Sequence, residues 1–313
     1  MPGIFEQAID ALCHGISFVF STGFAYGTSL ALLNKGIDLS KEKRLLLEEA
    51  KCLALRGRII FEFYSNFRDA IVDHRQSIIL FCHMNDPERL ANALLSLAFV
   101  ETHRNRYEDA RQALANCHDL QPHLSPQACI LYNIRLALVY QHQGLPLVAL
   151  QVLKSLLERS EVSLFVHMRR MILRQMGSVY LAQGQLSRAL RALNMAVHLV
   201  PDDDYQFRAD LASNLAQICT LQSRLGDALL SLQHAQHCLQ SIHYQGYSRT
   251  YLHTHIGRYA LACGDLDGAK VELNIVLRDN PNFCHAHRTR VKLARIELCH
   301  QSPATCLSLN SKC

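Results

Sequence analysis

The sequence predicts an all-α protein: an α-solenoid of about seven helical hairpins that form a superhelix and end in a terminal helix. The composition supports this prediction, because Leu and Ala are abundant while the 313 residues include only 14 Gly, 8 Pro and no Trp. Such a mixture favours helix over strand. A pair of small residues twelve positions apart also recurs with a period of about 40 residues, and a steady period of this length is typical of a solenoid.

The repeated pair is clearest in the stretch "QMGSVYLAQGQLSRALRALNMAVHLVP", where Gly177 and Ala189 lie among apolar residues at helical spacing. Gly184 and Gln185, between them, are typical of a hairpin turn. Small side chains at both positions of the pair allow two helix backbones to approach closely. The pairs at the other equivalent places, one with a substituted first member, are Gly15/Gly27, Arg58/Ala70, Ala98/Ala110, Ala137/Ala149, Ala216/Ala228 and Gly257/Ala269.

The prolines agree with this division into hairpins. Proline has no backbone N–H, so it is tolerated at helix ends and in the first turn but not in a helix interior. We expect hairpin ends at Pro122, Pro201 and Pro281, connectors at Pro87 and Pro126, and the start of a second helix at Pro146.

These units resemble tetratricopeptide repeats. The stretch quoted above fills the signature positions of that family with Leu173, Met176, Gly177, Tyr180, Ala189, Leu193, Ala196 and Pro201. The resemblance covers residues 4–300, and the period near 40 exceeds the usual ~34, so we expect lengthened helices or linkers. It implies a single solenoid over residues 1–302. Within it, repeats should match weakly over 1–85 and well over 86–283, before a terminal helix over 284–302 and a short tail over 303–313.

The resemblance also implies a binding surface, because in this family the first helix of each hairpin lines the concave groove. The partner-binding residues that this implies are Asn92, Arg135, His142, Arg174, Gln175, Ser178, Asp210, Asn214, Gln217, Tyr251, His255 and Arg258. Arginine guanidinium groups can pair with the carboxylates of an extended peptide, and side-chain amides can hydrogen-bond its backbone. We therefore expect a non-enzymatic interaction scaffold or adaptor that holds a partner peptide or helix with acidic features, as a subunit of a larger complex.

Two alternative functions remain open at this point. One is a regulatory sensor array, the ligand-reading part of a signalling or transcriptional regulator. The other is a membrane-tethered assembly factor, because residues 11–33 include no Asp, Glu, Lys or Arg and are long enough to span a bilayer. The hydroxyls, glycines and His14 within that segment favour instead a buried helix pair broken near "STG".

Other classes of protein are less compatible with the sequence. The chain has a modest net charge of +5, and its basic residues are dispersed along the sequence. We therefore expect no direct nucleic-acid partner. No motif for a nucleophile, a phosphate loop or a catalytic metal occurs, so we expect no catalytic residues and no cofactor. The 12 cysteines include no CxxC pair, and we expect them to be reduced thiols of an intracellular protein, in the cytoplasm or alternatively the nucleus.

One cluster near the C-terminus has the residue types of a metal site. Cys284 and His287 have a C-x-x-H spacing that can hold zinc, and Cys299 or His300 could add a ligand. The segment between them is predicted to be a helix, which separates its ends by some 15 Å or more. We therefore expect surface histidines and buried cysteines here, and no metal.

Overall fold

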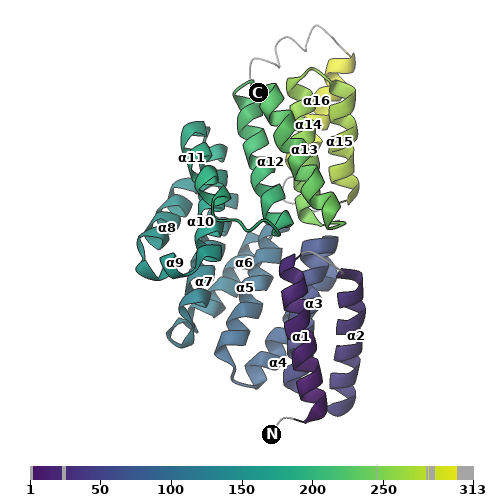
Figure 1. Ribbon diagram of the computed structural model, residues 1–313, viewed down its shortest axis with the longest axis vertical. Helices are drawn as coiled ribbons and strands as arrows, with labels where there is room; N and C mark the ends of the chain where they lie inside the picture. The colour runs from purple at the N-terminus through teal and green to yellow at the C-terminus, as the bar shows by residue number, and fades with distance from the viewer. Residues whose placement is uncertain (1–2, 23–25, 245, 280, 282–285, 302–313) are drawn as a thin grey trace.

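The computed structural model describes residues 3–22, 26–244, 246–279, 281 and 286–301. Within these ranges the chain folds into sixteen α-helices and one short 3₁₀ helix, with no strand (Figure 1). The predicted all-α class is confirmed.

The helices follow one another as antiparallel hairpins, and successive hairpins pack side by side into a superhelix (Figure 1). Their bounds are α1 (Ile4–Thr22), α2 (Tyr26–Lys43), α3 (Leu46–Tyr64), α4 (Phe67–His83), α5 (Pro87–His103), α6 (Tyr107–His118), α7 (Pro126–His142), α8 (Pro146–Glu158), α9 (Ser160–Leu164), α10 (Val166–Ala182), α11 (Leu186–Val197), α12 (Tyr205–Leu221), α13 (Leu225–Ser241), α14 (Tyr247–Ala262), α15 (Leu266–Asp279) and α16 (Ala286–Gln301). The short helix α9 and the 3₁₀ turn Gln121–His123 lie in connections between hairpins.

Local sequence signals explain where these helices begin and turn. Pro146 lies in the first turn of α8, as expected. Pro87 and Pro126 were expected in connectors but are the first residues of α5 and α7, where their missing N–H is equally well tolerated. Asp86 and Ser125 cap two of these helices by accepting hydrogen bonds from backbone N–H groups of the first turn. At the hairpin turns the chain passes through the left-handed region, with positive φ values at Gly144, Gly184 and Gly264 and also at Asn105 and Ser223.

The small residues at the helix crossings have the predicted effect in the central and C-terminal units. A Cβ added at Gly177 would lie 2.6 Å from the side chain of Leu193, and one at Gly257 would lie 2.9 Å from Leu273. Leu193 and Leu273 are fully buried on the second helices α11 and α15. Glycine therefore allows α10 and α14 to pack directly on the leucines of their partner helices.

The first two units differ from the prediction. In the second unit the small residue at the crossing is Gly57, not Arg58: a Cβ at Gly57 would lie 3.1 Å from the carbonyl oxygen of Ala70, whereas Arg58 is exposed. In the first unit Gly15 is exposed, and no described atom lies within 4 Å of the place of its Cβ. The Gly15/Gly27 pair is therefore not a close crossing; α1 and α2 instead both pack on α3.

The superhelix brings distant parts of the chain together. Helix α14 returns to the C-terminal end of α3, where the Tyr244 hydroxyl donates a hydrogen bond to the carbonyl of Glu62. Gly246 makes this approach possible, because a Cβ there would overlap the backbone of Glu62. Next to this contact the rings of Phe61 and Tyr247 stack with centroids 5.8 Å apart. One apolar core consequently joins residues of α1–α3 to residues of α12–α14.

Of the segment 11–33, residues 11–22 belong to α1 and residues 26–33 to α2; the expected break near "STG" falls partly on residues 23–25, outside the described residues. None of the described helices combines the length and apolar character needed to cross a bilayer. The histidines and cysteines of the possible zinc cluster, Cys284, His285, His287, Cys299 and His300, lie outside the residues whose side chains the structure describes.

Candidate functional site

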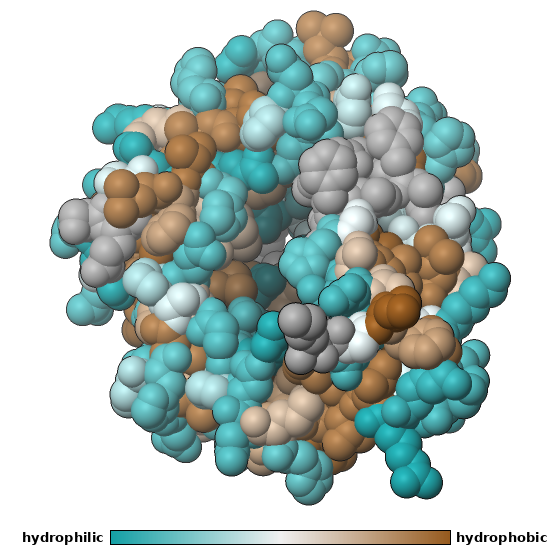
Figure 2. Space-filling view, turned by 60° about the horizontal axis from the view of Figure 1, so that its bottom comes forward, coloured by the Kyte–Doolittle hydropathy of each residue, from teal (hydrophilic) through white to brown (hydrophobic). Residues whose placement is uncertain are grey.

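The concave side of the superhelix encloses a cavity of about 180 Å³. Its walls come from the first helices of five successive hairpins, α5, α7, α10, α12 and α14. Figure 2 shows the molecule hollowed near its centre, with hydrophilic side chains on much of the rim. We refer to this cavity, bounded by those five helices, as the channel.

Ten of the twelve residues expected to bind a partner line the channel: Arg135, His142, Arg174, Gln175, Ser178, Asp210, Asn214, Gln217, Tyr251 and Arg258. The other two lie elsewhere. Asn92 is exposed near the start of α5, and His255 is buried with its ring edge-on to Tyr251, the centroids 4.4 Å apart. Whether the ten residues bind a partner stays a prediction.

Part of the lining was not predicted from the sequence, including Phe99, Leu138, Met171, Leu181 and Tyr247. Helical spacing could have found most of them, because side chains three or four residues apart share one face of a helix. Leu138, Met171 and Leu181 each stand three residues from a predicted position, and Tyr247 stands four residues before Tyr251. They were overlooked because the search favoured polar residues, although pockets are lined mostly by apolar and aromatic side chains.

A ladder of polar contacts links successive first helices along the channel wall. Gln141 donates a hydrogen bond to Ser178 (3.0 Å), and 37 residues separate the two. Tyr251 donates to Asn214 (3.0 Å) at the same separation. These separations are about one helical turn shorter than the repeat of about 40 residues, so each contact joins a residue to the next first helix, one turn before its equivalent position. Several predicted binding residues thus also hold the units together.

The charged contact of this ladder joins Arg174 on α10 to Asp210 on α12, with Nη1 3.0 Å from Oδ2. Asp210 is almost fully buried, and burial raises the pKa of its carboxyl group despite the neighbouring arginine. The ring of Phe207 lies under the guanidinium groups of both Arg170 and Arg174, at 4.8 Å and 5.2 Å. Arg174 is therefore held in place by an acid and an aromatic ring.

Arg135 on α7 has different surroundings. Its guanidinium carbon lies 3.6 Å from the centroid of the Phe99 ring, and its buried Nε has no hydrogen-bond partner. Among the described residues no carboxylate forms an ion pair with it. Arg174 pairs with Asp210, 36 residues later, whereas the residues 36 and 37 positions after Arg135 are the apolar Met171 and Ile172. Burial lowers the pKa of Arg135 to about 10, so it stays charged at neutral pH.

An aromatic wall stands beside Arg135. His103 lies edge-on to Phe99 at a centroid distance of 4.6 Å, and Tyr247 lies 5.5 Å from His103. Tyr247 belongs to the helix that returns to α3, so the contact between the two ends of the superhelix completes this wall. The result is a half-buried cation set among aromatic rings.

No protein-family model matches the sequence, and no curated protein sequence matches it. Among solved structures, that of a Rap protein complexed with competence and sporulation factor matches with a TM-score of 0.72. The match covers 95% of this chain and 88% of that chain, at 16% identity. The chain has a tetratricopeptide-repeat-type fold.

A second solved structure, the Cut9–Hcn1 hetero-tetramer of the APC/C, matches this tetratricopeptide-repeat-type solenoid with a TM-score of 0.57 and 16% identity. The match covers 89% of this chain but 47% of that one, so this chain spans about half the length of that neighbour. At such low identity both likenesses concern the fold. They agree with the helical hairpins described above.

Proposed function

We propose that this chain is a non-enzymatic interaction scaffold that receives an acidic segment of a partner protein in its channel. In this proposal a carboxylate of the segment pairs with Arg135, while the amides and hydroxyls of the wall hold its backbone. Arg135 carries the proposal, because it is a half-buried cation without an acidic partner among the described residues. A carboxylate placed against its guanidinium would form charge-assisted hydrogen bonds in a partly desolvated site.

The size of the channel limits what enters it. A cavity of about 150 Å³ accepts a benzene ring, so 180 Å³ has room for one or two side chains or a chain end. We therefore propose that an acidic side chain or a C-terminal carboxylate of the partner enters the channel, while the rest of the segment lies along its rim.

A peptide selection tests this proposal with defined ligands. Random peptides are displayed either with a free C-terminal carboxylate or as C-terminal amides, and bound sequences are recovered on the full chain. The proposal predicts enrichment of peptides that carry an Asp, a Glu or a free C-terminus at a fixed place. Arg135→Gln should abolish this enrichment, and Arg191→Gln, at an exposed position on the second helix α11, should keep it. Enrichment independent of carboxylates would contradict the proposal.

A regulatory sensor is the second candidate function. The likeness of almost the whole chain to a Rap protein that was solved in complex with competence and sporulation factor favours this alternative. A sensor differs from a scaffold in one measurable property: ligand in the channel must change the affinity for a second partner, and the second partner must change the ligand affinity by the same factor. A scaffold would show independent binding.

A further inference from the structure

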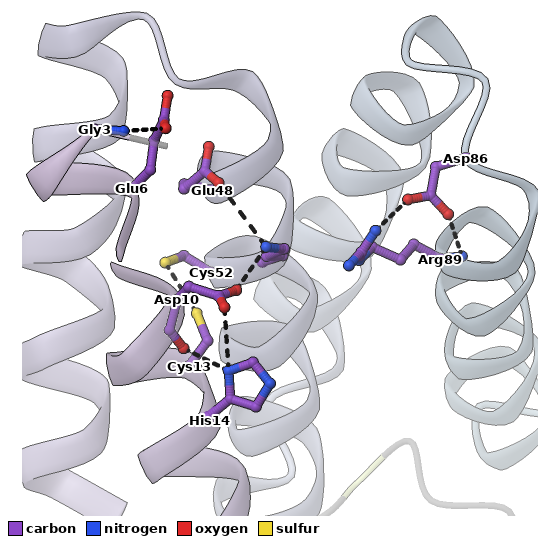
Figure 3. Close-up of polar contacts among 10 residues, drawn as sticks. Gly3, Glu6, Asp10, Cys13, His14, Glu48, Cys52, Asp86 and Arg89 are labelled. Atoms are coloured by element: carbon purple, nitrogen blue, oxygen red, sulfur yellow. Dashed lines mark hydrogen bonds and ion pairs between the residues drawn. The ribbon is translucent and has the colours of Figure 1, made fainter. Parts of the chain in front are cut away.

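Two cysteines face each other inside the N-terminal helices, far from the channel. The sulfurs of Cys13 on α1 and Cys52 on α3 lie 3.6 Å apart. Figure 3 shows the two side chains pointing toward one another. Both residues are buried, with 8% and 0% of their surfaces exposed. They are 39 residues apart in the chain, so the sulfurs connect two helices of different hairpins.

The packing around the pair leaves space on the side of α2. Gly36 of α2 faces Cys52, and a Cβ at Gly36 would lie 3.0 Å from the Cys52 sulfur. The absence of a side chain at Gly36 therefore leaves room for this sulfur at the meeting point of three helices.

A charged group stands beside the pair. Lys51 precedes Cys52 in the chain, and its Nζ lies 2.7 Å from a carboxylate oxygen of Asp10 on α1. The hydrogen bond with Cys52, and then the charge of Lys51, place the pKa of Cys13 below its usual value. The same hydrogen bond and burial raise the pKa of Cys52. Of the two thiols, Cys13 therefore ionises more readily, next to the charge of Lys51.

We propose that Cys13 and Cys52 form an oxidation site that a hydroperoxide converts into an intramolecular disulfide. The Cys13 thiolate attacks one peroxide oxygen and breaks the O–O bond, which gives a sulfenic acid at Cys13 and one water or alcohol after protonation. The Cys52 sulfur then attacks the Cys13 sulfur; the S–S bond forms, the S–O bond breaks, and the hydroxyl leaves as water with the Cys52 proton. Two thiols are oxidised, and one peroxide is reduced.

The disulfide would join α1 to α3 covalently. Its S–S length of about 2.05 Å requires the sulfurs to approach by roughly 1.5 Å. A cross-link between residues 39 positions apart restricts the unfolded chain, so the oxidised form should unfold at a higher temperature than the reduced form. This inference does not depend on the proposed function of the channel.

Peptide mapping of the oxidised full chain tests the inference. The purified protein is treated with hydrogen peroxide, alkylated with N-ethylmaleimide in denaturant and digested with trypsin. Cleavage after Lys35, Lys51 and Arg56 places the two cysteines on peptides 1–35 and 52–56. We expect a disulfide-linked species of these two peptides in most chains, its loss on addition of dithiothreitol, and a higher melting temperature before reduction.

Two variants show whether the link requires Cys52 specifically. In Cys52→Ser the linked species should be absent, and dimedone should label Cys13 after peroxide treatment, because its sulfenic acid has no thiol to react with. Cys117→Ser, at a buried cysteine of α6, should still form the link. The inference is wrong if wild-type protein shows no link between peptides 1–35 and 52–56 at peroxide concentrations that oxidise the exposed Cys82 and Cys263. That wild-type result decides the matter even if a variant fails to fold.

Discussion

Arg174 on α10 and Asp210 on α12 form a 3.0 Å ion pair across two neighbouring units, in the wall of the channel. From the sequence, Arg174 and Arg135 were both expected to be cations of the concave groove. The structure separates them, because Arg174 has a buried acidic partner and Arg135 has none among the described residues. A change at Arg174 should therefore affect folding, whereas a change at Arg135 should affect binding.

Arg174→Met is expected to lower the free energy of unfolding by about 2–3 kcal/mol at neutral pH. It leaves the Asp210 carboxylate buried without its partner, and the loss stays below that of a fully buried pair because Arg174 is partly exposed. The folded-state pKa of Asp210 would then rise further above the unfolded value, so the folded state would bind the extra proton and the variant should regain stability as the pH falls. Denaturant unfolding at several pH values measures both effects.

The matched control is the double variant Arg174→Met with Asp210→Leu. Because it removes both charges, it should recover much of the lost stability. If Arg174→Met unfolds like the wild-type protein at every pH, the ion pair does not support the packing of α10 on α12.

Gly177→Ala is expected to destabilise the fold by about 1–3 kcal/mol, because its Cβ would overlap the buried side chain of Leu193. Gly226→Ala is the matched control: Gly226 is an exposed glycine in α13 with no described atom within 4 Å of a Cβ. Alanine favours helix over glycine, so this change should leave stability unchanged or raise it by up to ~1 kcal/mol. Thermal unfolding monitored by circular dichroism compares the two. Equal effects would show that Gly177 is not a close crossing.

His74 predicts a pH dependence of stability. It is buried between α3 and α4 with neither ring nitrogen hydrogen-bonded, and burial lowers its pKa to about 3. The unfolded chain therefore binds a proton at His74 that the folded chain does not. This contribution to stability is complete above a pH of about 6.5 and is lost as the pH falls below it, by at most about 1.4 kcal/mol per pH unit.

His74→Phe keeps a ring at this place but cannot bind a proton. Between pH 7 and pH 5 it should lose less stability than the wild-type protein, a difference that urea unfolding at both pH values measures. Parallel losses in the two proteins would mean that His74 is accessible to protons in the folded state.

The repeat pattern predicts most of this fold because its packing is local. Gly177 and Ala189 reveal a crossing within one hairpin, and the 37-residue separation of Asn214 and Tyr251 is readable once the period is known. The return of α14 to α3 could not be predicted in this way. It depends on small rotations accumulated over several units, and the contact of Gly246 with Glu62 has no counterpart in any single repeat.

For the channel too, the sequence predicts the positions of residues but not the different roles of Arg135 and Arg174. Its first-helix positions follow from the resemblance to tetratricopeptide repeats, so Arg135 and Arg174 were both placed on the concave side. Their different roles depend on which residue stands 36 positions later on the next first helix, Met171 for Arg135 and Asp210 for Arg174. That comparison requires the register of neighbouring helices, and the second unit shows how easily the register is misjudged, since its crossing residue is Gly57 rather than Arg58.

A double-mutant cycle on binding tests the proposed role of Arg135 most directly. Isothermal titration calorimetry gives Kd for a selected peptide and for its analogue with the carboxylate replaced by an amide, each on wild-type protein and on Arg135→Gln. The proposal predicts a coupling energy of about 1.5 kcal/mol or more between Arg135 and the carboxylate. The melting temperature of Arg135→Gln should not fall, because the change removes a half-buried cation without a described acidic partner. A coupling near zero would contradict the claim that this channel receives an acidic segment at Arg135.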